Sequence, residues 1–326
     1  MEGAVVKVLF ITGAGRSGST ILHNVLGQVD GFAAVGELRY IWGRGVLNNQ
    51  LCGCGARFAD CRFWRDVMNE AFGSDIDETF AHEMLALTES FRVHNLPLMA
   101  YGGTRRRELH RLATYIERLD RLYRAIQSVS GCRVIVDSSK NPSYGYLLRE
   151  VRSIGPYFLH FIRDAPPVAH SWGKHKEFEP GVPMARKKPT GSALQWLARN
   201  AMAELFLPRN GSHWMQIRYE DLMQQPRDNM MSIVRWLEED VAGLPFATQH
   251  EAHLNEPNHS VFGNSVRFRL GPVTLQCDES WRHEMRPRDR RVVSLVTLPL
   301  RVRYGYLPMR AGLTPGTRSS TSADCV

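Results

Sequence analysis

The stretch from residue 5 to residue 27 constrains the fold of this chain more than any other. Residues 5–11 read Val-Val-Lys-Val-Leu-Phe-Ile, an apolar and largely β-branched run that is typical of a strand buried in a parallel sheet. Residues 13–20 form a glycine-rich turn, and residues 21–27 have helical character. A strand, a phosphate-type loop and a helix in this order predict an α/β fold of the P-loop NTPase type, with a central parallel β-sheet flanked by helices.

Further buried strands are predicted downstream, at residues 133–136, 157–162 and 215–218. Polar residues follow each of them directly, at 137–140, 163–164 and 219–221. Ligands in open α/β sheets bind beyond the carboxyl ends of the strands, so these positions predict where the site lies.

The remaining segments predict a single domain over residues 1–310 with a helical insertion. Residues 65–130 are mostly helical in pattern, with apolar residues at three- and four-residue steps between 104 and 129. We expect this insertion to shape the pocket for an acceptor substrate. The basic, Pro- and Gly-containing stretch 174–189 is either an active-site lid or a plain surface loop. Residues 311–326 are rich in Ser, Thr, Gly and Pro, which predicts a disordered tail.

The glycine-rich turn departs from the nucleotide-triphosphate pattern G-x₄-G-K-[ST] in an informative way. Ser19 stands where the lysine belongs, and the cation of the turn is Arg16. Because a Walker lysine contacts the β- and γ-phosphates and the next hydroxyl binds Mg²⁺, its loss argues against ATP hydrolysis and phosphoryl transfer. The backbone amides and hydroxyls that remain at a helix N-terminus can hold an anion without a metal, and an arginine suits bidentate contact with phosphate or sulfate oxygens.

The overall charge agrees with an anionic ligand. The formal net charge is +8, which indicates either a solvated basic surface or a polyanionic ligand or acidic substrate. Nucleic acid is not favoured, because the basic residues are scattered and no recognition motif is evident. No apolar run approaches the roughly 20 residues that span a bilayer, and residues 5–12 lead into the glycine-rich turn instead of a cleavage site. We therefore expect a soluble, cytoplasmic protein.

Two motifs now resemble a known family. The loop Gly15-Arg-Ser-Gly-Ser-Thr20 resembles the 5′-phosphosulfate loop of the sulfotransferases that use 3′-phosphoadenosine 5′-phosphosulfate (PAPS), in the arginine version of the tyrosylprotein and many bacterial members. The segment 161–171 resembles the family's 3′-phosphate motif, in which a strand-end arginine precedes a serine by eight positions. Arg163 and Ser171 have this spacing.

Two further segments resemble the same family. Residues 218–222 are similar to its Tyr-Glu-Asp segment, whose tyrosine, here Tyr219, lies near the adenine. Residues 259–267 are similar to a Gly-Asn-Pro-x-Arg segment of bacterial members, with Ser265 in place of the proline, which makes Arg267 a candidate nucleotide contact. The matches run in the family's order from residue 5 to about residue 285.

The resemblance implies a sulfotransferase that moves a sulfuryl group from PAPS to a hydroxyl-type acceptor by in-line attack with help from a general base. It implies no metal and no redox cofactor. The residues that it assigns to the donor nucleotide are Gly15, Arg16, Ser17, Gly18, Ser19, Thr20, Arg163, Ser171, Tyr219 and Arg267.

The predicted catalytic groups are Glu37, Lys140 and Arg16. Many small-molecule sulfotransferases use a histidine that would fall near residues 137–141, where this chain has none. The tyrosylprotein branch uses a glutamate about twenty residues past the loop arginine, and Glu37 lies 21 residues past Arg16. Glu37 is therefore the predicted base, unless it only orients Arg16 or caps a helix. Lys140 either bridges the leaving oxygen of the donor or is a surface lysine.

The cysteines at 52, 54 and 61 form a separate cluster with the spacing Cys-x-Cys-x₆-Cys. A zinc site needs a fourth ligand and commonly has a Cys-x₂-Cys spacing. We therefore expect buried structural thiols and no bound metal.

Two other functions remain open at this point. A P-loop kinase or NTPase would need a cation in place of Ser19 and a carboxylate for Mg²⁺. A non-catalytic basic protein that binds nucleotides or nucleic acid would bind mixed DNA or RNA in a salt-sensitive way. The sequence does not identify the acceptor, which is a small molecule, a lipid, a sugar or a peptide hydroxyl, nor does it indicate an oligomeric state.

Overall fold

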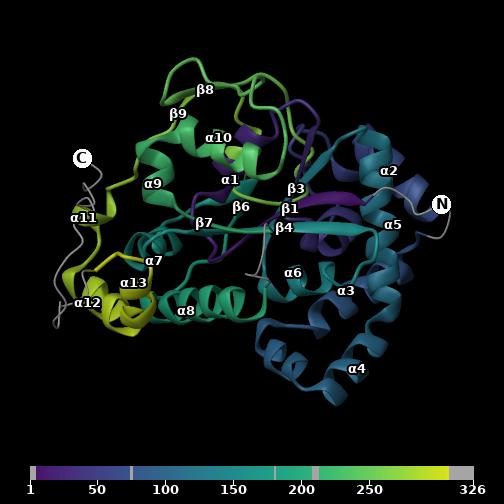
Figure 1. Ribbon diagram of the computed structural model, residues 1–326, viewed down its shortest axis with the longest axis horizontal. Helices are drawn as coiled ribbons and strands as arrows, with labels where there is room; N and C mark the ends of the chain where they lie inside the picture. The colour runs from purple at the N-terminus through teal and green to yellow at the C-terminus, as the bar shows by residue number, and fades with distance from the viewer. Residues whose placement is uncertain (1–4, 74–75, 180, 208–212, 308–326) are drawn as a thin grey trace.

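The computed structural model describes residues 5–73, 76–179, 181–207 and 213–307. Within them, parallel strands form a central sheet in the order β2-β3-β1-β4-β7 (Figure 1). Their bounds are β1 (Val6–Thr12), β2 (Phe32–Gly36), β3 (Val134–Lys140), β4 (Ile154–Ile162) and β7 (Trp214–Arg218). The sequence predicted all of these strands except β2. The sequence of β2, Phe-Ala-Ala-Val-Gly, contains two alanines and a glycine, which have little preference for strands.

The side chains of β1 alternate between two apolar cores, one on each face of the sheet. Val8 and Phe10 join one core, together with helices α2, α5 and α6. Leu9 and Ile11 join the other core, together with α1 and α10. The bounds of these helices are α1 (Ser19–Leu26), α2 (Arg62–Phe72), α5 (Ala113–Ser130), α6 (Pro142–Leu148) and α10 (Pro226–Trp236). The predicted fold class, a parallel sheet flanked by helices, is confirmed.

The helical insertion, predicted at residues 65–130, lies between β2 and β3 in the structure. It consists of α2, α3 (Glu78–Ser90), the 3₁₀ segment η5 (Val93–Ala100), α4 (Gly102–Arg111) and α5. The periodic stretch 104–129 is interrupted at Leu112, where φ and ψ are −97° and 6°, so it forms two helices instead of one. A hydrophobic period does not reveal such a break, because the apolar stripe continues across it.

The remaining elements come after β2 or after β4 in the chain, and among them α7 and α8 contribute residues to the carboxyl edge of the sheet. Helices after β4 are α7 (Ala165–Gly173), α8 (Pro189–Phe206), α9 (Tyr219–Gln224), α11 (Trp281–Glu284), α12 (Pro287–Val296) and α13 (Leu298–Arg303). Short antiparallel pairs are β5 (Glu177–Glu179) with β6 (Val182–Pro183), and β8 (Glu251–Leu254) with β9 (Gly271–Thr274). The other helical turns are η1 (Leu38–Tyr40), η2 (Ile41–Leu47), η3 (Phe58–Asp60) and η6 (Ser265–Phe268).

Among the described helices, none combines the length and the apolar character needed to cross a bilayer. The cytoplasmic location stays a prediction. The tail at residues 311–326, predicted to be disordered, lies outside the described residues.

Candidate active site

The loop between β1 and α1 is shaped by positive backbone angles. Arg16 and Gly18 have φ values of 70° and 88°. A side chain at Gly18 would come within 2.8 Å of the ring of Tyr219, so only glycine lets that ring pack against the loop. The N–H of Gly13 donates to the carbonyl of Lys140 at 3.3 Å, which ties the loop to the end of β3. The loop therefore presents the N-terminus of α1 to the space above the sheet.

A cavity of about 410 Å³ lies at the carboxyl ends of the strands, where the sequence predicted a site. It is lined by the loop after β1, by Glu37 after β2, by Lys140 at the end of β3 and by Arg163 after β4. We call this cavity the cleft. The predicted site residues that line it are Gly15, Arg16, Gly18, Ser19, Thr20, Glu37, Lys140, Arg163 and Ser171.

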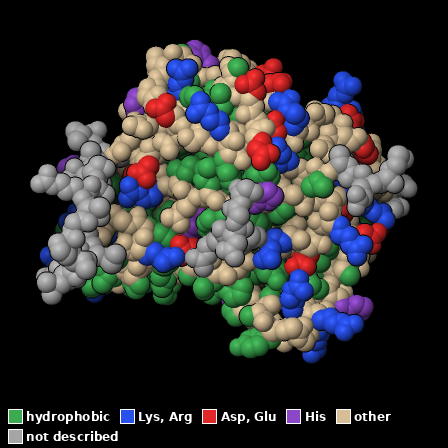
Figure 2. Space-filling view, in the orientation of Figure 1, with side chains coloured by type: hydrophobic (Ala, Val, Ile, Leu, Met, Phe, Trp, Pro, Cys, Tyr) green, Lys and Arg blue, Asp and Glu red, His purple; other side chains and the backbone are tan. Residues whose placement is uncertain are grey.

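Positive charge is concentrated in the cleft. The basic residues among its described lining residues are Arg16, Lys140, Arg163, Lys176, Lys187 and Arg199, whereas Glu37 is the one carboxylate among them. On the face drawn in Figure 2, by contrast, Lys and Arg side chains are spread among Asp and Glu side chains instead of gathered in one patch. The cleft thus has the electrostatics of a site for a multiply charged anion.

Two of these arginines keep buried N–H groups without a hydrogen-bond partner among the described residues. They are Nε and Nη1 of Arg16 and Nε of Arg163. Aromatic rings hold both guanidinium groups: Trp172 lies 4.9 Å from that of Arg16, and Tyr219 lies 4.3 Å from that of Arg163. Buried polar groups in proteins are almost always paired, so unpaired donors on two arginines that line the cleft are compatible with a ligand that supplies acceptors.

Mutual repulsion adds to the effect of burial on these cations. The pKa of Lys187 is lowered to about 8, first by burial and then by Arg199 and Arg16. Burial also lowers the pKa of Lys176, and Arg16 is the next cause. The pKa of Arg16 itself is lowered by burial, which Glu37 partly offsets. An anion bound in the cleft would relieve this repulsion.

Glu37 and Lys140 form an ion pair at the floor of the cleft. Nζ of Lys140 donates to Oε1 of Glu37 at 2.6 Å and to the carbonyl of Ser138 at 3.0 Å. Lys140 has a φ of 62°, an uncommon value for a non-glycine residue. The Glu37 side chain makes no capping hydrogen bond to η1. The structure thus brings two of the three predicted catalytic groups into direct contact.

Asp137 anchors the segment that carries Lys140. It is fully buried and accepts hydrogen bonds from the hydroxyl of Tyr123 at 2.6 Å and from the N–H of Ser139 at 2.8 Å. Burial raises the pKa of Asp137 to about 6, although these hydrogen bonds oppose the shift. The carboxylate therefore holds the loop after β3 in shape.

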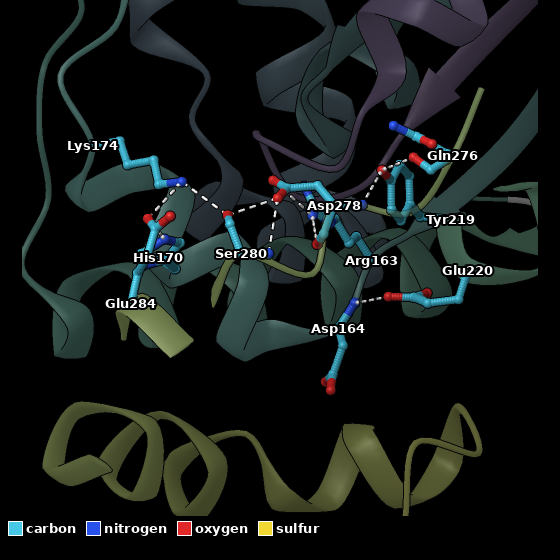
Figure 3. A network of polar contacts seen from close by, with 10 residues as sticks. All are labelled: Arg163, Asp164, His170, Lys174, Tyr219, Glu220, Gln276, Asp278, Ser280 and Glu284. Carbon is cyan, nitrogen blue, oxygen red and sulfur yellow. Dashed lines mark hydrogen bonds and ion pairs between the residues drawn. The ribbon is translucent and has the colours of Figure 1, made fainter. Parts of the chain in front are cut away.

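Arg163 also borders a second cavity, of about 270 Å³, which Tyr219 lines as well. Nη2 of Arg163 donates to the carbonyl of Asp278 at 3.1 Å and lies 3.4 Å from its Oδ2 (Figure 3). The hydroxyl of Tyr219 donates to the carbonyl of Gln276 at 3.3 Å. The two cavities therefore meet at Arg163, one on the side of the loop and the other on the side of Tyr219.

A polar network holds the 276–284 segment over α7. Glu284 contacts Nε2 of His170 at 3.1 Å and Nζ of Lys174 at 3.0 Å, and that Nζ also donates to Oγ of Ser280 at 2.9 Å (Figure 3). These contacts fix the segment that carries Asp278, and with it the wall of the second cavity.

Comparison with known families now bears on this geometry. A model described as the Sulfotransferase family matches residues 9–243 of the chain. The chain belongs to the sulfotransferase family. The matched region contains the loop, Glu37, Lys140, Arg163, Ser171 and Tyr219, and thus most of the predicted site residues.

Individual relatives are more distant. The chain is similar to nodulation protein NoeE of Sinorhizobium fredii (strain NBRC 101917 / NGR234), with 25% identity over 206 residues, which are 57% of this chain and 48% of that protein. The chain thus spans about half the length of the curated relative it matches.

Solved sulfotransferase structures resemble the chain over most of its length. The sulfotransferase domain from the curacin biosynthetic pathway shares 16% identity at a TM-score of 0.47 and covers 90% of this chain and 99% of its own. The sulfotransferase domain of the Synechococcus PCC 7002 olefin synthase shares 18% identity at a TM-score of 0.48. The similarity covers 94% of this chain and 97% of that domain. Sulfotransferase STF9 from Mycobacterium avium shares 12% identity at a TM-score of 0.46, and the similarity covers 93% of this chain and 78% of that protein. At such values these likenesses add nothing to the family match.

Three of the predicted donor residues do not line the cleft. Ser17 is 1% exposed, and Tyr219 lines the second cavity instead. Arg267 is 1% exposed, and its N–H groups donate to the carbonyls of Phe178 at 2.6 Å, Gly263 at 2.7 Å and Leu51 at 3.2 Å. The resemblance to the family placed Arg267 near the nucleotide, but in the structure its side chain is buried in the protein interior. The structure thus gives Arg267 backbone carbonyls as partners.

The sequence did not single out several residues that line the cleft. Lys176 and Lys187 come from the stretch 174–189, predicted to be either a lid or a surface loop, and Arg199 comes from α8. Trp172 adjoins Ser171 and stacks on Arg16. The basic composition of residues 174–189 was the sequence feature that could have indicated these cleft residues. In the structure this stretch borders the cleft.

Proposed function

We propose that this chain transfers a sulfuryl group from PAPS to a hydroxyl-type acceptor, with residues 1–310 acting as one domain. The observation that carries the proposal is the pair Arg16 and Arg163. Both line the cleft, and each has buried guanidinium N–H groups that lack partners among the described residues. A donor with a phosphosulfate at one end and a 3′-phosphate at the other would supply acceptors to both.

The lining residues divide between the two ends of the donor. In our proposal Arg16, Gly18, Ser19 and Thr20 bind the 5′-phosphosulfate with the amides at the start of α1, which favour an anion. Arg163 and Ser171 bind the 3′-phosphate. Tyr219 then borders the adenosine, in the second cavity that adjoins Arg163.

The donor supplies an activated sulfuryl group when it is bound. As the bond to sulfur breaks, negative charge builds on the 5′-phosphate oxygen. Arg16 and the loop amides, which border the cleft, are the groups that we propose stabilise that charge. Lys140 has three N–H donors, of which Glu37 and the carbonyl of Ser138 take two. The third is left for the leaving oxygen.

Glu37 is the proposed general base. Its carboxylate lines the cleft and contacts Nζ of Lys140 at 2.6 Å. Removing the proton from the acceptor hydroxyl makes that oxygen the nucleophile for in-line attack on sulfur. Lys140 thereby links the group that receives the proton to the site where the leaving group departs.

The acceptor enters, in our proposal, from the side of the helical insertion. A neighbouring cavity of about 330 Å³ shares Gln195 and Arg199 with the cleft. Its other walls include Glu89, Val93 and His94, from the end of α3 and the start of η5. The sulfuryl-accepting hydroxyl belongs to a small molecule, a lipid, a sugar or a peptide, and this opening is accessible to each of them.

Calorimetric titration with adenosine 3′,5′-bisphosphate, the product of the donor, tests the proposal. We expect wild-type protein to bind, and Arg16→Ala and Arg163→Ala each to weaken binding about 10- to 100-fold, because each loses charge-assisted hydrogen bonds. Arg133→Ala serves as the control. Arg133 is an exposed arginine just before β3, at the opposite edge of the sheet, and its removal changes the net charge equally.

Circular dichroism should show all of these proteins folded. If folded wild-type protein does not bind adenosine 3′,5′-bisphosphate, the proposal fails. ATP and mixed-sequence nucleic acid then become the ligands to titrate. If it binds, incubation with ³⁵S-labelled PAPS and a panel of hydroxyl acceptors tests transfer itself.

A further inference from the structure

A cluster of three cysteines and one histidine lies outside the cleft. Cys52, Cys54 and Cys61 come from the segment between η2 and α2, and His259 comes from the segment between β8 and η6. Their three Sγ atoms and one ring nitrogen all lie within 4.8 Å of one another. None of the four residues lines the cleft. The sequence lacked a fourth ligand because His259 lies 198 residues beyond Cys61.

The distances within the cluster agree with the edges of a zinc-centred tetrahedron. With Zn–S bonds of about 2.3 Å and Zn–N bonds of about 2.0–2.1 Å, two sulfurs lie about 3.8 Å apart and a sulfur and a nitrogen about 3.6 Å apart. The Sγ atoms of Cys54 and Cys61 are 3.7 Å apart. Nδ1 of His259 lies 3.4 Å from Sγ of Cys61 and 3.7 Å from Sγ of Cys52.

A disulfide does not explain the cluster. A disulfide bond brings two sulfurs to about 2.05 Å, well short of the separation between Cys54 and Cys61. All three cysteines are free, Cys52 and Cys61 are buried and Cys54 is half-buried.

The surrounding residues hold the histidine in place. The ring of Phe63 stacks on that of His259, with centroids 4.5 Å apart and an angle of 14°. Nε1 of Trp64 donates to the carbonyl of His259 at 2.9 Å. Gly53 has no room for a side chain, since a Cβ there would lie 2.2 Å from Oδ1 of Asn258. The glycine between the first two cysteines thus permits the close approach of the histidine segment.

A buried cation balances the charge that such a site would carry. Three thiolates and a neutral imidazole around Zn²⁺ have a net charge of −1. The guanidinium of Arg267 is buried and donates to the carbonyl of Leu51, the residue before Cys52. Positive charge therefore lies next to the cluster, where a negative centre needs it.

We propose that Cys52, Cys54, Cys61 and His259 bind one Zn²⁺ ion in a closed structural site. The thiols release three protons to solvent as the metal binds. Four protein ligands leave no open position, so the ion holds structure and performs no chemistry. It ties the cysteine segment to the segment after His259, whose Phe262 and Asn264 line the cleft. This proposal replaces the sequence-based expectation of thiols without metal.

Metal analysis of the full chain tests the proposal. We expect about one zinc per chain in wild-type protein by plasma mass spectrometry, and a loss of most of it in Cys54→Ser, which removes the most exposed ligand. Cys132→Ser is the matched control, because Cys132 is free and buried but lies outside the cluster. Replacing zinc by Co²⁺ in wild-type protein should give the thiolate–cobalt absorption of a tetrahedral site.

The Co²⁺ spectrum keeps the test decisive even where Cys54→Ser does not fold. Folded wild-type protein that retains neither Zn²⁺ nor Co²⁺ after incubation with an equimolar amount would overturn the proposal. So would unchanged zinc in folded Cys54→Ser, or a Cys54–Cys61 disulfide found by mass spectrometry in protein purified without oxidant.

Discussion

The cleft and the segment 258–268 each bury an arginine, and the two arginines differ in the number of carbonyl partners and in their contact with the cleft. Arg163 lies under the ring of Tyr219 at the edge of a cavity, and its buried Nε has no partner among the described residues. Arg267 donates to the carbonyls of Phe178, Gly263 and Leu51, and it lines no part of the cleft. The resemblance to sulfotransferases assigned both residues to the nucleotide.

The difference shows what separates a binding cation from a structural one. Burial costs both guanidinium groups their hydration, so each needs acceptors. Nη1 and Nη2 of Arg267 donate to three backbone carbonyls, whereas Arg163 makes its hydrogen bonds to Asp278 alone. Each of the two has a buried Nε without a partner among the described residues, and what separates them is that Arg163, like Arg16, lines the cleft and Arg267 does not. We infer that the cations of the cleft bind an anion, whereas Arg267 stabilises the segment 258–268 through its hydrogen bonds to backbone carbonyls.

The largest expected effect is a loss of turnover when Glu37, the carboxylate that lies among the cations of the cleft, is replaced. Glu37→Gln keeps the shape of the side chain but removes the base, so turnover should fall about 10²- to 10⁴-fold while nucleotide affinity stays nearly unchanged. Steady-state kinetics with PAPS and calorimetry with adenosine 3′,5′-bisphosphate measure the two quantities. Glu204→Gln, at a buried glutamate that pairs with Arg303, is the matched control. Turnover equal to wild type in Glu37→Gln would remove Glu37 from this role.

The second prediction sets Arg267 directly against Arg163. Arg267→Met should lower the free energy of unfolding by about 2–4 kcal/mol, because three buried carbonyls lose their donor. Arg163→Met should change this free energy little and weaken nucleotide binding instead. Urea unfolding and calorimetry on both variants give the comparison. Normal stability with lost nucleotide binding in Arg267→Met would place Arg267 at the ligand and remove the contrast.

The smallest expected effect is a pH dependence of binding. The pKa of Lys187 is lowered to about 8 by burial and by Arg199 and Arg16, and a bound anion favours the charged form and raises this pKa again. Affinity for adenosine 3′,5′-bisphosphate should therefore be full below pH 7 and fall about 2- to 10-fold as the pH rises from 7 to 9.

Calorimetry of Lys187→Met should show weaker binding at pH 7 and a flatter pH profile. Lys174→Met is the control, since Lys174 pairs with Glu284 and does not line the cleft. An equally steep profile in Lys187→Met would assign the pH dependence to another group.

Much of the fold was predictable because its signals are local. The strands β1, β3 and β4 contain continuous apolar runs, since both faces of a parallel sheet are buried. The edge strand β7 is shorter and only partly buried, and its signal was weaker. β2 was missed because its short, alanine-rich sequence becomes a strand through pairing with β3, a tertiary contact. The interruption at Leu112 was missed for a related reason, since an apolar stripe specifies which face is buried and does not specify where a helix bends.

The candidate site was predictable where one motif holds both the residue and its backbone. The loop at residues 15–20 and the pair Arg163 and Ser171 each lie within a strand–turn–helix unit, so spacing alone positions them at the carboxyl edge of the sheet. Lys176, Lys187 and Arg199 join the cleft through the packing of the 174–189 stretch and α8, which no spacing rule describes.

The sequence by itself determined the class of fold, the position of the anion site at the edge of the sheet and the residues of its loop, because each depends on contacts between near neighbours along the chain. Only the tertiary structure decided that Glu37 meets Lys140, that Arg267 faces the interior and that His259 joins the three cysteines. These pairs are separated by 103, 89 and 198 residues, counting Arg267 to its partner Phe178 and His259 to Cys61. Whether such groups meet depends on how the layers pack, which no local pattern records.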